Sequence, residues 1–582
     1  MVHNTLHQLA QTFRTTAGRG LLFLRLHREL TMILFLSFTM KLFLAPWNSY
    51  WFDELLSIYA YGIVHDNVFD ALRELAETSI HPPLYQFVLY LWIEIFGHTE
   101  GMTRTLSTLY VTLATLFLYL FALRLFGRRT AVAASLFFAF SSSAIQFSLE
   151  TRSYGQSLFL VTLSSYCLLR YIEHLQARDI GWRNILMSRA FLWLVLSNVG
   201  LLFTHYFNIF FLAAQGFFLL LWLFWKAPKS NALAGLLKAV SGYAVVLLVF
   251  LLVWGQHFFS RSNATRDRFE SDVPAYIPTE MLSIFLWQNL NVFLPRVVFT
   301  LIGLLFVVTL WRSLFASGAI VWRGRKLRIQ PAEQHHIQSL LQVYILFWLI
   351  LPFVFAYLGF LVISFDRYLT RYFVFVAPAL MMALVLAFEE GIRLTDILVR
   401  RLTRSSIWPY YRANATLFAF AAAIVLVAPM GCAAANYQKH DWRGIARHVV
   451  DTVNYDHDHR YIVYDTGPRS QSSFDYYLER YHESLRVYDV VSRAEEQALA
   501  AGENITPQIL GQEAVIAAYD YLILIFTHEL AINYPNIRRL LEDRYPVHYA
   551  QLSQEGRGFI VYRVKGAESS SITLGTSSDS EP

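Results

Sequence analysis

Eleven long apolar runs, each 15 to 24 residues in length, most strongly limit what this chain can fold into. An α-helix needs roughly 17–25 residues to cross a lipid bilayer, so each run forms a membrane span once frayed ends are included. The composition agrees, because 55% of the 582 residues are hydrophobic and only 15% are charged. These proportions exclude a wholly soluble, disordered or fibrous chain and predict a mainly α-helical, polytopic membrane bundle of about 11 spans. The runs occupy residues 30–45, 104–123, 130–147, 154–169, 187–204, 207–225, 236–254, 297–311, 340–363, 373–388 and 415–433.

Positive charge predicts the orientation of these spans. Two shorter apolar stretches, Leu84–Phe96 and Met281–Leu294, are assigned to the outer membrane interface rather than to crossings. With that assignment, most Lys and Arg residues before residue 435 lie on the cytoplasmic side, as the positive-inside rule requires. We therefore expect residues 1–29 in the cytoplasm and a membrane module over residues 30–434, with residues 46–103 as its first outer loop. The expected location is a bacterial inner membrane.

The polar segment after the last span has a different character. Residues 435–565 alternate short apolar strands with amphipathic helices, beginning with the strand YIVYD at residues 461–465. This alternation is typical of a small α/β domain with a largely parallel sheet. An odd number of spans places the domain outside the cytoplasm. Residues 566–582 are rich in Ser and poor in apolar residues, which predicts a disordered tail.

Two polar features follow the first span. Asp53 and Glu54 form an acidic pair within WNSYWFDELLSIYAYG, where the aromatic residues indicate interface depth. The pair is open to two interpretations, as the cap of an interfacial helix or as a general base at the membrane surface. His81 then precedes two prolines, which restrict its backbone to extended conformations and fix a turn. That turn is either a rigid corner or part of a site.

Arginines on the predicted outer side interrupt the charge bias of the rest of the chain. An arginine at the end of a span often anchors the helix at the interface. Arg367 and Arg371, however, lie four residues apart, so on a helical turn both would face the same way. Such a pair is better suited to binding an anion, and the fork of the guanidinium group matches phosphate.

Six short motifs, taken in order, resemble one family. They are WFDE, HPPLY, FGHTEGMTRTLS, LFGRR, ETRSY and RYLTRY, and the likeness spans about residues 47–160 with a weaker echo at 365–378. The family is that of integral-membrane, lipid-phosphate-dependent glycosyltransferases with the C-type (GT-C) fold, which includes protein O-mannosyltransferases and the lipid A aminoarabinose transferase. The resemblance implies that Asp53 is the catalytic aspartate with Glu54 beside it. It also implies a donor-phosphate site made of His81, Arg152, Tyr154, Arg367, Arg371 and Tyr372.

The activity implied by this resemblance is inverting transfer of a hexose or pentose from a polyprenyl-phosphate donor. The acceptor is a lipid, glycan or protein at the outer face, and nucleic acid is not an expected partner. The residue inventory fits, because a lipid phosphate leaves as a stabilised anion and needs no general acid, unlike the leaving group of a glycosidase. One base and a set of cations are then sufficient. No cofactor is expected, with a divalent metal ion left open.

Three alternatives remain at this point. A transporter or lipid flippase would use charged residues within its spans, but these runs hold few besides Lys41 and Lys238. An oligosaccharyltransferase-like enzyme with a pyrophosphate donor would need several carboxylates for a metal ion. The predicted outer side offers few of them beyond Asp53, Glu54, Glu150 and Asp366. A non-catalytic scaffold would tolerate exchange of Asp53.

Overall fold

The computed structural model divides into two compact units, which are described separately. The first comprises Met1–Pro46 and Asn67–Tyr437, and the second comprises Trp47–Asp66 and Gln438–Pro582. The segment with the acidic pair therefore groups with the C-terminal part of the chain. The structure describes residues 25–78, 81–177, 188–226, 232–264, 303–312, 320–323, 326–329, 336–363, 370–422, 442–455, 460–465, 476–477, 487–489, 513–526, 541–552 and 558–564.

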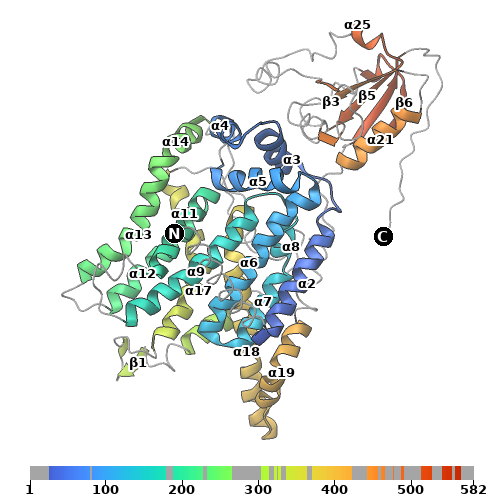
Figure 1. Ribbon diagram of the computed structural model, residues 1–582. Helices are drawn as coiled ribbons and strands as arrows, with labels where there is room; N and C mark the ends of the chain where they lie inside the picture. The colour runs from blue at the N-terminus through green and yellow to red at the C-terminus, as the bar shows by residue number, and fades with distance from the viewer. Residues whose placement is uncertain are drawn as a thin grey trace, which may run out of the picture. The chain divides into compact units, whose positions relative to one another are not determined.

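The first unit is a helical bundle with a small β-hairpin (Figure 1). Its N-terminal helices are α2 (Arg28–Leu44), α4 (Val68–Thr78), α5 (Pro83–Phe96), α6 (Glu100–Phe126), α7 (Arg128–Ala139), α8 (Ser142–Gln146) and α9 (Tyr154–Ala177). They are followed by α11 (Arg189–Thr204), α12 (Asn208–Lys226), α13 (Ala232–Val253) and α14 (Gly255–Ala264). A short apolar helix at Gly303–Arg312 precedes the hairpin of β1 (Ile320–Arg323) and β2 (Lys326–Ile329). The unit ends with α17 (His336–Ile363), the 3₁₀ helix η4 (Thr370–Val376), α18 (Ala377–Thr403) and α19 (Trp408–Ala422).

Most predicted spans in the described residues coincide with helices. Among the described residues, three helical stretches are long and apolar enough to cross a membrane by length and composition, namely Glu100–Phe126, Gln342–Gly359 and Arg371–Thr403. The run predicted at 130–147 is not one continuous helix. It breaks after α7, and the Ser141 hydroxyl accepts a hydrogen bond from the Ala144 amide (3.2 Å) to begin α8. The stretch Met281–Leu294 lies outside the described residues.

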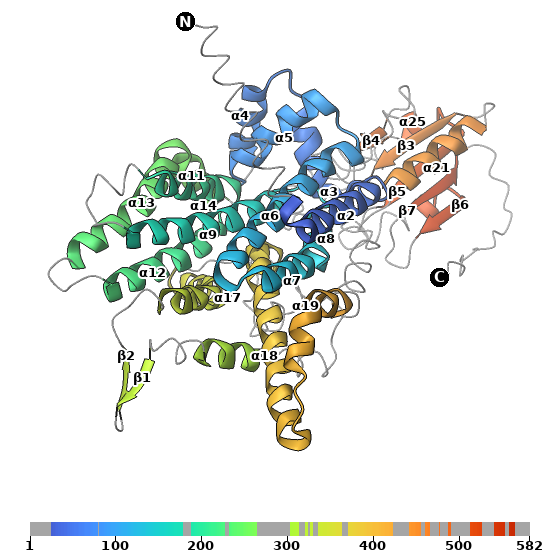
Figure 2. The same ribbon diagram turned by 60° about the horizontal axis from the view of Figure 1, so that its bottom comes forward.

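α9 lies at the centre of the bundle. It packs against both α6 and α11, as Figures 1 and 2 show from two directions. Its entry is tight, because a Cβ atom on Gly155 would lie 3.1 Å from the Ser107 carbonyl oxygen of α6. Further along, the Ser164 hydroxyl donates to Asn198 Oδ1 of α11 (2.5 Å), and Gln215 Nε2 of α12 donates to Ser164 Oγ (2.9 Å). In a bilayer the hydrophobic effect does not drive helices together, because lipid tails are as apolar as the helix surfaces. Hydrogen bonds between paired polar side chains therefore help to hold these helices in contact.

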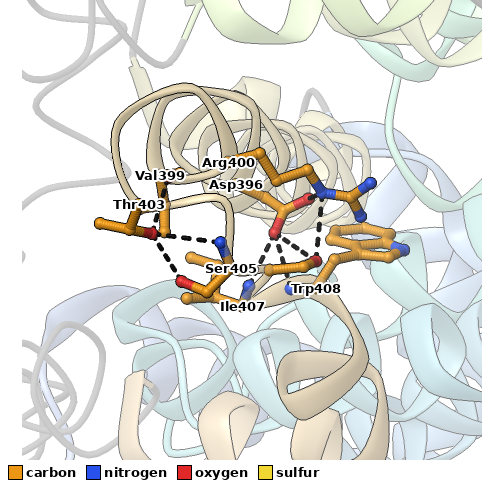
Figure 3. A network of polar contacts seen from close by, with 8 residues as sticks. Asp396, Val399, Arg400, Thr403, Ser405, Ile407 and Trp408 are labelled. Atoms are coloured by element: carbon orange, nitrogen blue, oxygen red, sulfur yellow. Dashed lines mark hydrogen bonds and ion pairs between the residues drawn. The ribbon is translucent and has the colours of Figure 1, made fainter.

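A tight corner joins α18 to α19 (Figure 3). The chain turns at Arg404, whose backbone is left-handed (φ 58°). One oxygen of the Asp396 carboxylate accepts hydrogen bonds from the Ile407 amide (2.7 Å) and the Trp408 amide (2.9 Å) at the start of α19. Its other oxygen pairs with Arg400 Nε at 2.8 Å. Asp396 therefore caps the next helix from within the preceding one.

The second unit contains α3 (Phe52–Leu55), the π-helix η1 (Leu56–Ile63), α21 (Trp442–Tyr455) and a five-stranded sheet. The strands are β3 (Tyr461–Asp465), β4 (Val487–Asp489), β5 (Tyr521–Phe526), β6 (Val547–Leu552) and β7 (Gly558–Arg563), with the short helix α25 (Glu513–Ile516) before β5. Their order in the sheet is β4-β3-β5-β7-β6.

The described part of this unit contains both helices and strands, but the prediction of a largely parallel sheet is wrong. β3 pairs in parallel with β4 and β5, whereas β7 pairs antiparallel with both β5 and β6. The antiparallel part of the sheet includes β6, a strand that was not predicted from the sequence. β6 lies at the edge of the sheet and pairs with β7. The core is formed by alternate strand residues such as Ile462, Leu522 and Ile560, each at most 1% exposed.

Candidate active site

The acidic pair begins the short helix α3 in the second unit, and the structure gives its two members different environments. Trp51 is the N-cap residue, since its carbonyl accepts hydrogen bonds from the amides of Glu54 (3.0 Å) and Leu55 (3.1 Å). Glu54 is fully buried, and its Oε2 accepts a hydrogen bond from the Trp51 amide at 3.2 Å. This is the half of a capping box in which the third helical residue reaches back to the N-cap. Asp53 lies one residue earlier and keeps a partly exposed side chain.

The backbone after Asp53 is unusual. η1 is a π-helix of eight residues that follows α3 directly, and the Ser57 hydroxyl donates to the Asp53 carbonyl at 3.1 Å. π-helical turns are rare and occur frequently at functional sites. The local geometry is thus consistent with both interpretations of the pair, a cap formed by Glu54 and a polar side chain presented by Asp53.

The first unit contains a basic and aromatic cluster, here named the basic cluster and defined by His81, Arg152, Tyr154, His205, Arg371 and Tyr372. Arg152, Tyr154 and His205 are buried, and the other three are partly exposed. Arg152 is 7% exposed, and its Nη2 lies 3.0 Å from His81 Nε2. A guanidinium group can only donate, so His81 Nε2 accepts this hydrogen bond. The two prolines after His81 start α5, with Pro82 in an extended conformation (ψ 157°). The predicted turn thus holds the His81 ring against Arg152.

His205 was missed by the sequence analysis. It lies between α11 and α12 within THYFN and is 6% exposed. Its ring centroid is 4.9 Å from that of Tyr372, 6.0 Å from that of Tyr154 and 6.4 Å from that of His81. One sequence signal could have identified His205, namely a titratable residue between two predicted spans. Burying an ionisable side chain at the end of an apolar run costs free energy, so such residues are often functional.

The hydrogen bonding of His205 defines its chemical form. The Phe207 amide donates to Nδ1 at 3.3 Å, so the proton of the neutral ring is on Nε2. Burial lowers the pKa of His205 to about 3, and the positive charges of Arg152 and Arg371 act in the same direction. Among the described residues, the Phe207 amide is the only hydrogen-bond partner of this ring. His205 is therefore a neutral donor within a positively charged surrounding.

Of the remaining residues predicted for the phosphate site, Arg371 and Tyr372 lie in the basic cluster, whereas Arg367 lies outside the described residues. Arg371 and Tyr372 lie in η4, where Tyr372 packs on Phe207 with ring centroids 4.7 Å apart. Arg371 lies near enough to influence His205 electrostatically. The predicted partnership of Arg367 with Arg371 cannot be followed, because Arg367 and Asp366 lie outside the described residues. Arg371 itself is in a 3₁₀ rather than an α-helical turn.

Among the described residues, carboxylates do not gather at the basic cluster in a metal-binding set. Glu150 is buried near Arg152, with its carbonyl accepting from the Arg152 amide (2.9 Å) and from the Ser107 hydroxyl (2.7 Å). Its Oε1 accepts a hydrogen bond from Gln146 Nε2 at 3.3 Å. Within the described ranges, no group of three or more His, Cys, Asp or Glu residues could hold a metal ion.

Comparison with known proteins supports a glycosyltransferase. Residues 80–254 match the family model described as dolichyl-phosphate-mannose-protein mannosyltransferase. This match covers less than a third of the chain but contains His81, Arg152, Tyr154 and His205. A search of curated protein sequences finds no significant match.

Two solved proteins align with this chain over most of its length. ArnT from Cupriavidus metallidurans in the apo state aligns with a TM-score of 0.50 at 14% identity, covering 94% of this chain and 98% of ArnT. The same protein bound to undecaprenyl phosphate gives a TM-score of 0.48 at 14% identity, with 91% and 97% coverage. The archaeal oligosaccharyltransferase AglB from Archaeoglobus fulgidus, in complex with an inhibitory peptide and a dolichol-phosphate, gives 0.45 at 12% identity, with 91% and 74% coverage.

The fold therefore defines a class: the chain has the fold of an integral-membrane GT-C glycosyltransferase. Within that class it is similar to ArnT over nearly the full length of both chains, and it carries a mannosyltransferase-type segment. The resemblance predicted from the sequence motifs is confirmed.

Proposed function

We propose that this protein is an inverting glycosyltransferase that takes a sugar from a polyprenyl-phosphate donor. The observation that carries the proposal is the basic cluster. Arg152 and Arg371 supply positive charge, His205 supplies a neutral donor, and Tyr154 and Tyr372 supply hydroxyl groups, all in or beside the mannosyltransferase-type segment. A pair of arginines, with Arg152 buried and Arg371 partly exposed, fits a phosphate anion, because the guanidinium fork binds two phosphate oxygens at once.

In the proposed reaction, Asp53 acts as the general base. Its carboxylate removes the proton from the acceptor hydroxyl or amine as that atom attacks the anomeric carbon. The bond between the anomeric carbon and the phosphate oxygen breaks, and the electron pair leaves with the polyprenyl phosphate. Inversion at the anomeric carbon follows from a single displacement. The arginines stabilise the charge that develops on the phosphate.

The other predicted residues take supporting roles. His81 orients Arg152 by accepting its hydrogen bond, rather than binding phosphate as a cation. Glu54 holds the amide of Trp51 and so fixes the helix that carries Asp53. Arg367 is retained as a phosphate-site candidate on its sequence position alone. The sugar is a hexose or pentose, and the acceptor is a lipid, a glycan or a protein.

The experiment that tests this function compares cells with and without the gene by mass spectrometry of their lipids, glycans and proteins. Loss of one sugar from one acceptor class, with accumulation of the polyprenyl-phosphate-sugar donor, is the expected result. In parallel, native mass spectrometry of the purified protein should show retained undecaprenyl phosphate in preference to neutral undecaprenol. A transporter or flippase would instead shift the donor between leaflets and leave the purified protein inactive in transfer.

The orientation is tested by labelling in intact cells. We propose an integral protein of a bacterial inner membrane, with a cytoplasmic N-terminus, 11 spans and an extracytoplasmic C-terminal unit. In a background without Cys167 and Cys432, Arg266→Cys should react with a membrane-impermeant thiol reagent and Arg178→Cys should not. Labelling of Arg178→Cys from outside would overturn this orientation and make Leu84–Phe96 a crossing helix.

A further inference from the structure

The segment that carries Asp53 is attached to residues more than 380 positions away in the sequence. Trp47–Asp66 forms one compact unit with Gln438–Pro582, although residues 67–437 separate the two stretches in the sequence. We infer that the C-terminal α/β unit is the positioning element for the proposed catalytic base, acting through Tyr477 and Arg443. This inference rests on the proposed function and gives the C-terminal unit a role in it.

The first attachment is a buried hydrogen bond between Tyr50 and Tyr477. The Tyr50 amide donates to the Tyr477 hydroxyl oxygen at 2.7 Å, and both side chains are fully buried. The neighbouring Tyr476 ring packs against the Tyr50 ring edge to face, with centroids 5.8 Å apart. A buried backbone amide must have a partner, and here a side chain from the C-terminal part of the chain provides it. The position of Tyr50 therefore depends on Tyr477.

The second attachment is the hydrogen bond from Arg443 Nη2 to the Trp47 carbonyl oxygen. Arg443 lies in the first turn of α21, which buries Ala446 and Val449 on one face (both 0% exposed). That helix is fixed to the sheet by His448, whose ring lies 5.2 Å from Phe559 of β7. Figure 1 shows α21 lying beside the strands. Through this hydrogen bond, Arg443 holds the backbone at Trp47 in a fixed position relative to α21 and the sheet.

Two residues separate the attachment at Tyr50 from Asp53, and five separate the attachment at Trp47 from it. Trp51 follows Tyr50 directly and is the N-cap of α3, and its amide is held by Glu54 Oε2. Displacement of Tyr50 therefore moves the N-cap and turns the helix on which Asp53 lies. A base acts only within hydrogen-bonding distance of its proton, and a misplacement of about 1 Å can lower the rate roughly a hundredfold. The attachments are suited to prevent that displacement.

Tyr477→Phe tests the inference, because it removes one acceptor oxygen and keeps the ring. In the full-length protein in lipid nanodiscs, hydrogen exchange in a peptide covering residues 47–56 should become at least tenfold faster. The single-turnover transfer rate should fall roughly tenfold to a hundredfold, while the affinity for undecaprenyl phosphate stays unchanged. Tyr562→Phe is the matched control, since Tyr562 is an equally buried tyrosine of β7 in the same unit. It should change none of the three measurements.

Arg443 provides a second, graded test. Arg443→Ala should accelerate exchange in the same peptide and slow transfer, and Arg443→Lys should restore part of both because it keeps a donor for the Trp47 carbonyl. Unchanged exchange in both Tyr477→Phe and Arg443→Ala would overturn the inference. Faster exchange with a normal transfer rate would also overturn it, since the attachment would then be structural only. Failure of the proposed function is seen separately, as normal transfer by Asp53→Asn, whereas the exchange measurement requires no activity.

Discussion

The two candidate regions of this molecule are built in opposite ways. The basic cluster of the first unit is assembled from buried and half-buried side chains at the ends of helices, as in the contact of Arg152 with His81. The acidic segment of the second unit is a short helix followed by a π-helix, fixed through its backbone by Tyr477 and Arg443. A site for a charged ligand binds that ligand more tightly when its polar side chains are already held in place away from water. A general base must stay partly exposed to reach its acceptor, so contacts from other parts of the chain have to fix its position.

The largest expected effect comes from the acidic segment. Asp53→Asn keeps the size of the side chain but removes the base, so turnover should fall roughly 10²–10⁴-fold, the usual contribution of general-base catalysis. Binding of undecaprenyl phosphate should stay at the wild-type level, because the basic cluster is untouched. Single-turnover transfer and native mass spectrometry measure the two quantities. Near-normal transfer by a folded Asp53→Asn protein would remove Asp53 from the mechanism and make Glu54 or Glu150 the next candidate.

The second expected effect separates the basic cluster from the acidic segment. Arg152→Ala should weaken undecaprenyl phosphate binding about tenfold to a hundredfold, because a charge-assisted hydrogen bond contributes about 1.5–3 kcal/mol. Arg371→Ala should act in the same direction. Arg73→Ala is the control, since Arg73 is an exposed arginine of α4 paired with Asp70 at 3.2 Å. Equal affinity in all three variants would reassign Arg152 and Arg371 to structural roles.

These two regions also differ in how far the sequence alone could predict them. Arg152, Tyr154 and His81 could be found because each lies in a short motif at the end of an apolar run. The attachment of Tyr50 to Tyr477 could not, because it depends on a contact between residues 427 positions apart. Asp53 could be found, but its distinction from the buried, capping Glu54 is a matter of which way each side chain points on one helical turn.

The fold shows the same limit. The strands β3, β5 and β7 could be predicted from their dense apolar β-branched and aromatic residues. β6 (VHYAQL) could not, because its apolar and polar residues alternate weakly. The break between α7 and α8 was also hidden, since the apolar residues of FAFSSSAIQF continue through it and only the side chain of Ser141 ends one helix and starts the next. The number of spans stays a prediction.

His205 gives the third expected effect, which concerns pH. Burial holds the pKa of His205 at about 3 in the folded protein, against its ordinary value of 6.5, so the unfolded chain takes up the additional proton as the pH falls below about 6.5. Because the unfolded state binds this proton and the folded state does not, the free energy of unfolding decreases as the pH falls from about 6.5 toward 3. His205→Asn removes this dependence. Its melting temperature in detergent should therefore fall less than that of the wild type between pH 7 and pH 5, by roughly 1 °C for each kcal/mol involved in a chain of this length.

The control for this measurement is His257→Asn, because His257 lies in α14 and is not part of the basic cluster. His257→Asn should follow the wild-type curve. An identical pH dependence in the wild type and His205→Asn would show that another group accounts for the loss, and it would argue against a neutral, buried donor at this position. The test probes the basic cluster without requiring a donor lipid or an acceptor.

The smallest expected effect compares two capping carboxylates. Asp396 caps α19 in the first unit much as Glu54 caps α3 in the second, each by accepting backbone amides (Figure 3). Asp396→Ala leaves the Ile407 and Trp408 amides without this acceptor, so the free energy of unfolding should fall by about 1 kcal/mol, as for other lost caps. Transfer should stay within about twofold of the wild-type rate, because, among the described residues, the hydrogen bonds and the ion pair of the Asp396 carboxylate all lie within the corner between α18 and α19. Glu54→Ala should lose a similar amount of stability but slow transfer about tenfold or more, since its cap fixes the helix that carries Asp53. Melting curves and single-turnover rates for the two variants separate the outcomes. If Asp396→Ala slowed transfer as much as Glu54→Ala at equal stability, the special role of the acidic segment would be refuted, and general weakening of the fold would explain both.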